Sequence, residues 1–205
     1  MKLTWYGHAC FRMETEGGSI VFDPYSPGSV PGVELPPLSA ELCFCSHEHG
    51  DHYYPQAVKL TKRAADVGVV QVPSFHDGEG GAKRGKNTIT LIEADGLRAA
   101  HLGDLGHVLT DDQVQALGRV DVLMIPVGGF FTIDAKEASQ VVRQLKPRIV
   151  IPMHYKGADF GFDVISTVDE FLSLSENVRI FDSSSIDLST VDGPLTAVLK
   201  CPVKS

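Results

Sequence analysis

The chain has 205 residues, of which 43% are hydrophobic and 21% are charged, a balance typical of globular proteins, so we expect a single domain over residues 1–205. The formal net charge of −8 argues against a nucleic-acid-binding surface, because phosphate contacts usually come from a basic face. No stretch approaches the roughly 20 apolar residues that span a bilayer, and the N-terminus lacks the apolar core of a signal peptide. We therefore expect a cytoplasmic protein that does not bind membranes.

The predicted secondary structure alternates strands with helices, which is typical of an α/β protein. Short apolar runs bounded by turn residues indicate strands, and polar capping residues ahead of a periodic segment indicate helix starts. In chain order we expect strands over residues 2–6, 10–14, 19–23 and 42–45, a helix over 55–65, strands over 67–72, 88–93 and 97–102, a helix that starts at Thr110 or Asp111, a strand over 120–125, a helix from Asp134 to Leu145, a strand over 149–153, a helix near 167–174, and then the final strands.

The segment from residue 46 to residue 52 holds an unusual density of metal-ligating side chains, since it reads Ser-His-Glu-His-Gly-Asp-His. Imidazole nitrogens and carboxylate oxygens are ordinary ligands of divalent transition metals. The segment follows a predicted strand, and α/β proteins often place their chemistry on such loops. Alternate side chains on a turn can point to two nearby positions. We therefore expect a two-metal centre, with His47 and His49 on one ion and Asp51 and His52 on the other.

Two metal ions need more ligands than these four side chains. Three further candidates each follow a predicted strand: His76 comes after the strand over 67–72, Asp104 after the strand over 97–102, and His154 after the strand over 149–153. A single histidine at a strand end is often structural. The repetition of the pattern on three strands indicates a shared site.

These residues resemble the metallo-β-lactamase-fold hydrolases, whose HxHxDH signature is similar to residues 47–52. The branch that the chain resembles most is that of the uncharacterised metal-dependent hydrolases related to ascorbate-6-phosphate lactonase. The segments that carry this resemblance are Gly7–Phe11, Phe22–Pro24, His101–His107, Pro126–Gly129 and Pro152–Tyr155.

The resemblance implies an α/β fold in four αββα layers, with two mixed β-sheets inside and helices outside. It also implies that Asp104 bridges the two ions, that His76 completes the first and that His154 completes the second. The chain is short and lacks the long insertions that define substrate in characterised members. The identity of the substrate therefore does not carry over.

Two adjacent cations lower the pKa of a water molecule between them and polarise the scissile group, so we expect hydrolysis by a metal-bridging hydroxide. The expected substrate is a small ester, lactone, phosphodiester or amide, which can be anionic, and the expected ion is zinc, with manganese, iron or nickel as alternatives. The alternative functions are an RNA- or DNA-processing phosphodiesterase and a non-catalytic metal-binding module. A nucleic-acid partner is disfavoured by the acidic composition, and a homo-oligomer is compatible with the sequence.

Further residues are candidates for roles around the metal ions. Asp51, Asp104 and His8 are the expected catalytic residues, with His8 as a substrate contact or proton donor. Asp23 is expected to hydrogen-bond a ligand imidazole. His101 either supports the Asp104 loop or faces away from it. The remaining candidates are His107 and Tyr155 as oxyanion donors, and Lys83, Arg84 and Lys86 in or beside the glycine-rich stretch 78–85, where a solvated loop is favoured over steering of a phosphate.

Overall fold

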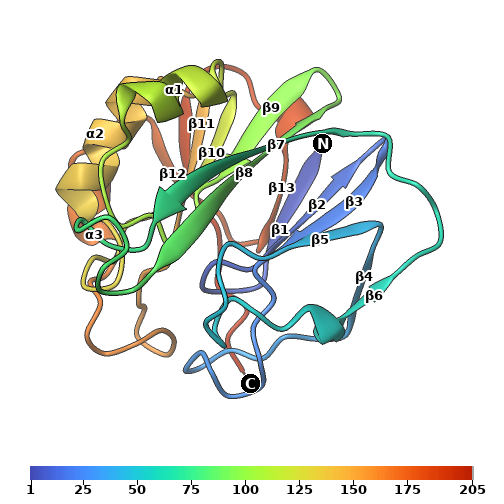
Figure 1. Cartoon of the computed structure of the whole chain (residues 1–205), viewed down its shortest axis with the longest axis horizontal. Coiled ribbons are helices and arrows are strands. Elements are labelled where there is room, and N and C mark those ends of the chain that lie inside the picture. Colours follow the sequence, from blue (N-terminus) through green and yellow to red (C-terminus); the bar gives the residue numbers. More distant parts are fainter. Residues whose placement is uncertain (205) are drawn as a thin grey trace.

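Two β-sheets face each other in the computed structural model, which describes residues 1–204 (Figure 1). The five-stranded sheet has the order β13 (Ser185–Asp187), β1 (Lys2–Trp5), β2 (Phe11–Thr15), β3 (Gly18–Phe22) and β5 (Leu42–Phe44). The seven-stranded sheet has the order β12 (Val178–Ile180), β14 (Leu195–Val198), β11 (Ile149–Met153), β10 (Val122–Pro126), β9 (Leu97–His101), β8 (Lys86–Ala94) and β7 (Gly68–Phe75). Both sheets are mixed, so the two central layers of the expected sandwich are confirmed.

The α-helices of residues 1–204 are α1 (Asp111–Leu117), α2 (Ala135–Leu145) and α3 (Asp169–Ser173), and they lie outside the seven-stranded sheet (Figure 1). The α2 helix starts where its sequence predicts. Asp134 accepts hydrogen bonds from the backbone of Lys136 and Glu137, and the Glu137 carboxylate accepts one from the backbone of Asp134. This reciprocal capping satisfies backbone donors that a helix start otherwise leaves free. The buried side of α2 carries Ala138 and Val141.

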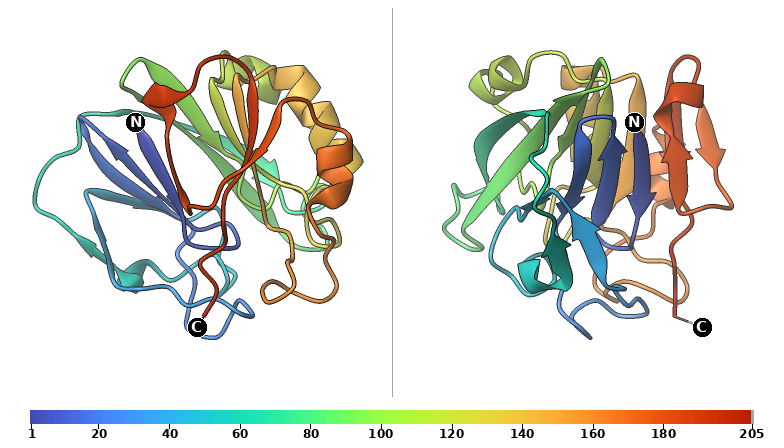
Figure 2. Two further views of the ribbon diagram at one scale, coloured as in Figure 1. Left: turned by 180° about the vertical axis from the view of Figure 1, so that it is seen from behind. Right: turned by 90° about the vertical axis from the view of Figure 1, so that its right-hand side faces the viewer.

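The prediction of a helix over residues 55–65 is wrong. Residues Pro55–Ala57 form a single 3-10 turn, and Val58–Leu60 form β6, which pairs in parallel with β4 (Leu38–Ala40) beside the smaller sheet (Figure 2). The side chains from residue 59 to residue 64 are exposed, so a helix here would have no apolar face to bury. Pairing with β4 instead satisfies the backbone hydrogen-bonding groups of Val58–Leu60.

Strands β10 and β11 are buried along their whole length and pair in parallel. Such strands are covered on both faces and read as continuous apolar runs. The core between the two sheets includes Trp5, Phe11 and Phe22 from the smaller sheet. The ring of His101, at the end of β9, stacks on that of Phe22 with centroids 5.1 Å apart.

Strand direction brings the predicted site residues to one edge of the sandwich. In the smaller sheet β1, β3 and β5 share one direction, because β2 is antiparallel to β1 and β3 while β5 is parallel to β3. In the larger sheet the same logic gives β7, β9, β10 and β11 one direction. The candidate site residues follow the C-terminal ends of these strands, namely His8 after β1, Asp23 after β3, residues 46–52 after β5, His76 after β7, Asp104 after β9 and His154 after β11.

Candidate metal centre

The loop over residues 46–52 is held by backbone and side-chain hydrogen bonds that fix the direction of its histidines. The backbone nitrogen of Ser46 donates to the Asp23 carboxylate at 2.7 Å, and the Ser46 hydroxyl donates to the same carboxylate at 2.7 Å. The backbone nitrogen of His52 then donates to the carbonyl of His49, which closes a turn. A turn of this kind sends neighbouring side chains in different directions.

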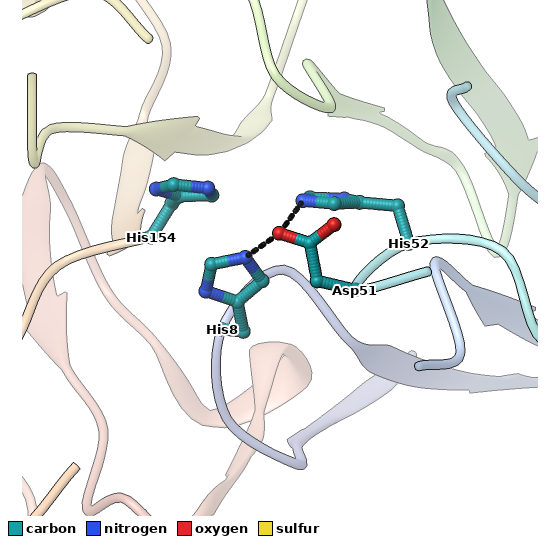
Figure 3. A group of neighbouring side chains, drawn as sticks. All are labelled: His8, Asp51, His52 and His154. Carbon is teal, nitrogen blue, oxygen red and sulfur yellow. Dashed lines mark hydrogen bonds and ion pairs between the residues drawn. The ribbon is translucent and has the colours of Figure 1, made fainter. Parts of the chain in front are cut away.

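The seven predicted ligands converge at this edge, and His8 joins them. Within residues 1–204, side chains whose ligand atoms lie within 4.8 Å of one another form three groups: His8, Asp51, His52 and His154; His47, His49 and His76; and His47, His52 and Asp104. Figure 3 shows the first group, in which the side chains approach one another from three separate loops. His49 and part of Asp51 face solvent, whereas His52 and His154 are buried.

The carboxylate of Asp104 lies between the two histidine-rich groups. Its Oδ2 atom is 3.3 Å from Nε2 of His76 and 3.2 Å from Nε2 of His154. The same oxygen is 3.9 Å from Nε2 of His47, and Oδ1 is 3.2 Å from Nε2 of His52. One carboxylate is therefore within reach of nitrogen atoms from both sides of the site.

Several atoms that point into this cluster are buried without a hydrogen-bond partner in the described part of the chain. They are Nε2 of His47, His52 and His154 and Oδ1 of Asp104. Leaving buried polar atoms unpaired costs about 1–3 kcal/mol each. Imidazole nitrogens with carboxylate oxygens form a donor set that suits zinc and similar ions. The residues present therefore fit a bound divalent metal.

Electrostatics act differently on the histidines of the cluster. Burial acts to lower the pKa of His52, but the carboxylates of Asp104 and Asp23 raise it well above its usual value. Burial lowers the pKa of His8 to about 3 and that of His47 to about 4, so both rings are neutral near pH 7. Burial alone would raise the pKa of Asp104, but the nearby His154 and His52 hold it well below its usual range. A metal binds neutral imidazole and ionised carboxylate, so His47 and Asp104 are already in their metal-binding protonation state, whereas His52 would release a proton when a metal binds.

The backbone is strained where it presents some of these side chains. His8 has a φ of 52°, Asp23 of 44° and His154 of 53°, all in the left-handed region that residues with a Cβ seldom adopt. Gly103 has a φ of 56°, and a Cβ at this position would lie 2.4 Å from the Cβ of Ser46. Glycine therefore lets the Asp104 loop approach the loop over residues 46–52.

Three of the predicted candidates lie outside the metal-capable groups. Nε2 of His101 is 2.8 Å from the carbonyl of Ala9, and its Nδ1 accepts a hydrogen bond from the backbone nitrogen of Gly103 at 3.2 Å, so the ring supports both the loop that carries His8 and the Asp104 loop. Both ring nitrogens of His107 contact backbone atoms, at Val108 and Phe75. Tyr155 packs against Trp5, with ring centroids 5.5 Å apart, and against Phe160.

Two residues that sequence reasoning missed hold the site together. Ser46 joins Asp23 to His47, because its hydroxyl is also 2.9 Å from Nδ1 of His47. Asn87 accepts a hydrogen bond from the backbone nitrogen of Asp104 at 2.9 Å and donates to the carbonyl of Leu102. The position of Ser46 next to the histidine cluster was a usable signal, whereas Asn87 lies in a strand with no local motif.

Comparisons with known proteins point to one family. The family described as Beta-lactamase superfamily domain matches residues 2–154. The UPF0173 metal-dependent hydrolases of Thermococcus onnurineus and Carboxydothermus hydrogenoformans are 31% identical over 192 residues and 30% identical over 193 residues, and each match covers 76% of this chain and 84% of the relative. The crystal structure of a candidate Zn-dependent hydrolase of the metallo-β-lactamase superfamily from Thermotoga maritima is 36% identical, with a TM-score of 0.77 over 97% of this chain and 99% of that chain.

Among residues 1–204, no helix has the length and the apolar character that crossing a membrane requires.

Proposed function

Because the chain belongs to the UPF0173 metal-dependent hydrolases of the metallo-β-lactamase superfamily, we propose that it hydrolyses a small ester, lactone, phosphodiester or amide at a centre of two divalent cations. The observation that carries this proposal is the position of Asp104, whose carboxylate lies between His47 and His76 on one side and His154 on the other. A carboxylate with two oxygens can serve two ions at once.

In this proposal His47, His49 and His76 hold the first ion. Asp51, His52 and His154 hold the second, and Asp104 bridges the two. Zinc suits these nitrogen and oxygen donors, although manganese, iron and nickel accept them too. When bound, two such ions would polarise the scissile group and lower the pKa of a water molecule that they share, which supplies the nucleophile.

The chain's own residues orient the ligands and admit the substrate. Nε2 of His8 lies 3.3 Å from Oδ2 of Asp51 (Figure 3). We assign to His8 the role of donating a hydrogen bond that fixes the position of this carboxylate. Asp51 is partly open to solvent and His49 is exposed, so a substrate can approach from this side. The buried side chains of His52 and His154 keep water away from the opposite side.

Metal analysis tests the number of ions. Inductively coupled plasma mass spectrometry on the purified, zinc-loaded protein should find about two equivalents, and H49A should retain about one. The matched control is H107Q, which changes a histidine outside the cluster and should keep both ions. A single equivalent in the wild-type protein would contradict the dinuclear centre.

Turnover tests the reaction. A panel of p-nitrophenyl esters, lactones and bis-p-nitrophenyl phosphate should contain a substrate whose hydrolysis falls at least 100-fold in H49A and D51A, because metal-site losses of this kind cost several kcal/mol of transition-state stabilisation. H107Q should retain its rate. Wild-type turnover in both H49A and D51A would refute the proposal.

A further inference from the structure

The loop that follows β7 is ordered by hydrogen bonds to one buried carboxylate, and it carries a cation. The Asp77 carboxylate is buried and accepts hydrogen bonds from four backbone nitrogens, those of Glu79, Gly81, Lys83 and Arg84, at 2.7–2.9 Å. The loop closes where the backbone nitrogen of His76, one of the proposed ligands, donates to the carbonyl of Gly85 at 3.0 Å. This glycine-rich stretch is therefore a preorganised loop anchored beside the site, and most of its residues are exposed, as its sequence predicts.

Arg84 is the cation that this loop presents. Its guanidinium carbon lies 5.7 Å from the ring centroid of Phe131, and no carboxylate within residues 1–204 is at ion-pair distance from it. Lys83, its neighbour, is instead paired with Glu79. Contact with an aromatic face holds a guanidinium in place while its N–H groups, which lie in its plane, stay free to donate.

The aromatic side chains beside Arg84 lead directly to the metal-capable cluster. The rings of Phe131 and Phe162 have centroids 5.8 Å apart, and those of Phe162 and His8 are 5.5 Å apart. Phe131 is in the loop after β10 and Phe162 in the loop after β11, and the backbone nitrogen of Ser166 joins these loops through a hydrogen bond to the carbonyl of Gly128. Both loops start at the C-terminal sheet edge that also carries Asp104 and His154.

The backbone of the loop after β10 is strained at its tip. Phe130 has a φ of 59° and is 63% exposed, with its ring 4.8 Å from that of Phe131. A phenylalanine in the left-handed region costs stability, and such strain is commonly retained where a loop contacts a ligand. Folding alone gives no reason to expose a large apolar ring in this conformation.

We propose that Arg84 binds an anionic group of the substrate, a carboxylate or a phosphate, while Phe131 and Phe162 contact the apolar part between that group and the scissile bond. This inference rests on the proposed function and names the class of substrate for the same site. A planar guanidinium with free N–H groups suits either anion, because it can form two parallel hydrogen bonds to a pair of oxygens. The cation stands out because the chain as a whole carries a formal net charge of −8.

The affinity of small probes for the zinc-loaded protein, measured by isothermal titration calorimetry, tests this inference without any need for turnover. The probes are the monohydroxamates of succinic, glutaric, suberic and sebacic acid, which end in a carboxylate, and the ω-phosphono hydroxamic acids of the same lengths, which end in a phosphonate. Each is compared with the neutral alkanohydroxamic acid of the same length, of which butyrohydroxamic acid is the shortest. The lengths vary because two aromatic rings separate Arg84 from the metal-capable cluster. We expect an acidic probe to bind about tenfold more tightly than the neutral one, as for a charge-assisted hydrogen bond at a half-buried site. The acid with the larger preference identifies whether a carboxylate or a phosphate is the natural group.

Variants distinguish the contribution of Arg84 to anion binding from that of the metal ions, which also attract anions. R84Q should lose the preference for the acidic probe and bind butyrohydroxamic acid as tightly as the wild type does. K83Q, the matched control from the same loop, should keep the preference. F131L should lose part of it, because Arg84 loses its aromatic support.

The outcomes distinguish this inference from the proposed function. If butyrohydroxamic acid binds but no acidic probe is preferred, or if the preference survives in R84Q, the anion-binding role of Arg84 is wrong while the metal centre stands. If butyrohydroxamic acid fails to bind the zinc-loaded protein, the metal centre itself is wrong, and this inference falls with it.

Discussion

Nδ1 of His52 lies 2.8 Å from Oδ2 of Asp23, and this buried contact fixes which nitrogen of His52 faces the metal-capable cluster. An ionised carboxylate accepts, so Nδ1 carries a hydrogen and Nε2 is the nitrogen that faces Asp104 and would bind an ion. The same Asp23 oxygen accepts from the hydroxyl of Ser46, which contacts Nδ1 of His47. One carboxylate thus orients one ligand of each proposed ion.

Replacing Asp23 should weaken both metal sites together. D23N keeps the size of the side chain but removes the charge that holds the two imidazoles, and losses of such supporting contacts typically cost about 10–100-fold in metal affinity. Competition with a chromophoric zinc chelator measures both affinities. D163N, which changes an exposed aspartate on the loop after β11, is the control and should match the wild type. A loss confined to one of the two ions would contradict the shared role of Asp23.

The parts of the fold that local sequence determines could be predicted. Strands β10 and β11 are continuous apolar runs, and the cap of the α2 helix is encoded by Asp134 and Glu137, so no distant contact was needed to recognise them. The prediction of a helix over residues 55–65 failed because the structure of this segment depends on β4, which lies about 20 residues earlier in the chain. A strand that forms by pairing with a distant partner carries little signal of its own.

The candidate site divides in the same way. Residues 46–52 are recognisable by the density of their ligands, and strand ends point to His76, Asp104 and His154. Sequence cannot tell which side chains beyond the strand ends turn inward, so His107 and Tyr155 were candidate oxyanion donors although the structure turns both towards other partners. The left-handed backbone at His8 and His154 and the support from Asn87 arise from tertiary packing.

Gly103 should tolerate no side chain. In G103A the new Cβ would lie 2.4 Å from the Cβ of Ser46 and 2.5 Å from Oδ1 of Asn87, and its φ of 56° adds strain. We expect a loss of about 1 kcal/mol in unfolding free energy from the backbone conformation and about 1–3 kcal/mol more from the clash. Urea unfolding of the metal-free protein measures it. G96A is the control, since Gly96 has a φ of 74° but a Cβ added there would meet no atom within 4 Å. Equal losses in the two variants would mean that the close approach is unimportant.

Glu41 should make stability depend on pH in the acid range. Its carboxylate accepts hydrogen bonds from the backbone nitrogen and hydroxyl of Ser19 and from the hydroxyl of Thr61, and the Ser19 contacts above all lower its pKa from 4.5 to about 2. The folded-state pKa is depressed, so this stabilisation is complete above about pH 4.5 and is lost as the pH falls towards 2.

The variant E41Q should therefore be less stable than the wild type at pH 7, by at most about 1 kcal/mol because solvent screens the site. The difference should shrink between pH 4.5 and 2. Urea unfolding midpoints at pH 7, 5, 4 and 3 measure this trend. E34Q, at an exposed ion pair with Lys204, should show little change at any pH. A difference that grows on acidification would have the wrong sign and would reject this assignment.

Removing metal should lower the melting temperature substantially, because the cluster leaves buried nitrogen and oxygen atoms without partners when no ion is bound. A metal that binds only the folded chain stabilises it by about 2.7 kcal/mol per site when its free concentration is 100 times its Kd, which for a chain of this length corresponds to roughly 5–10 °C per site. Scanning calorimetry with zinc and then with excess dipicolinate measures the shift. H49A should keep about half of it, because the proposed ligands of the other ion, including the bridging Asp104, are unchanged, whereas H107Q should keep all of it. A melting temperature that does not respond to zinc would show that these side chains meet for a reason other than metal binding.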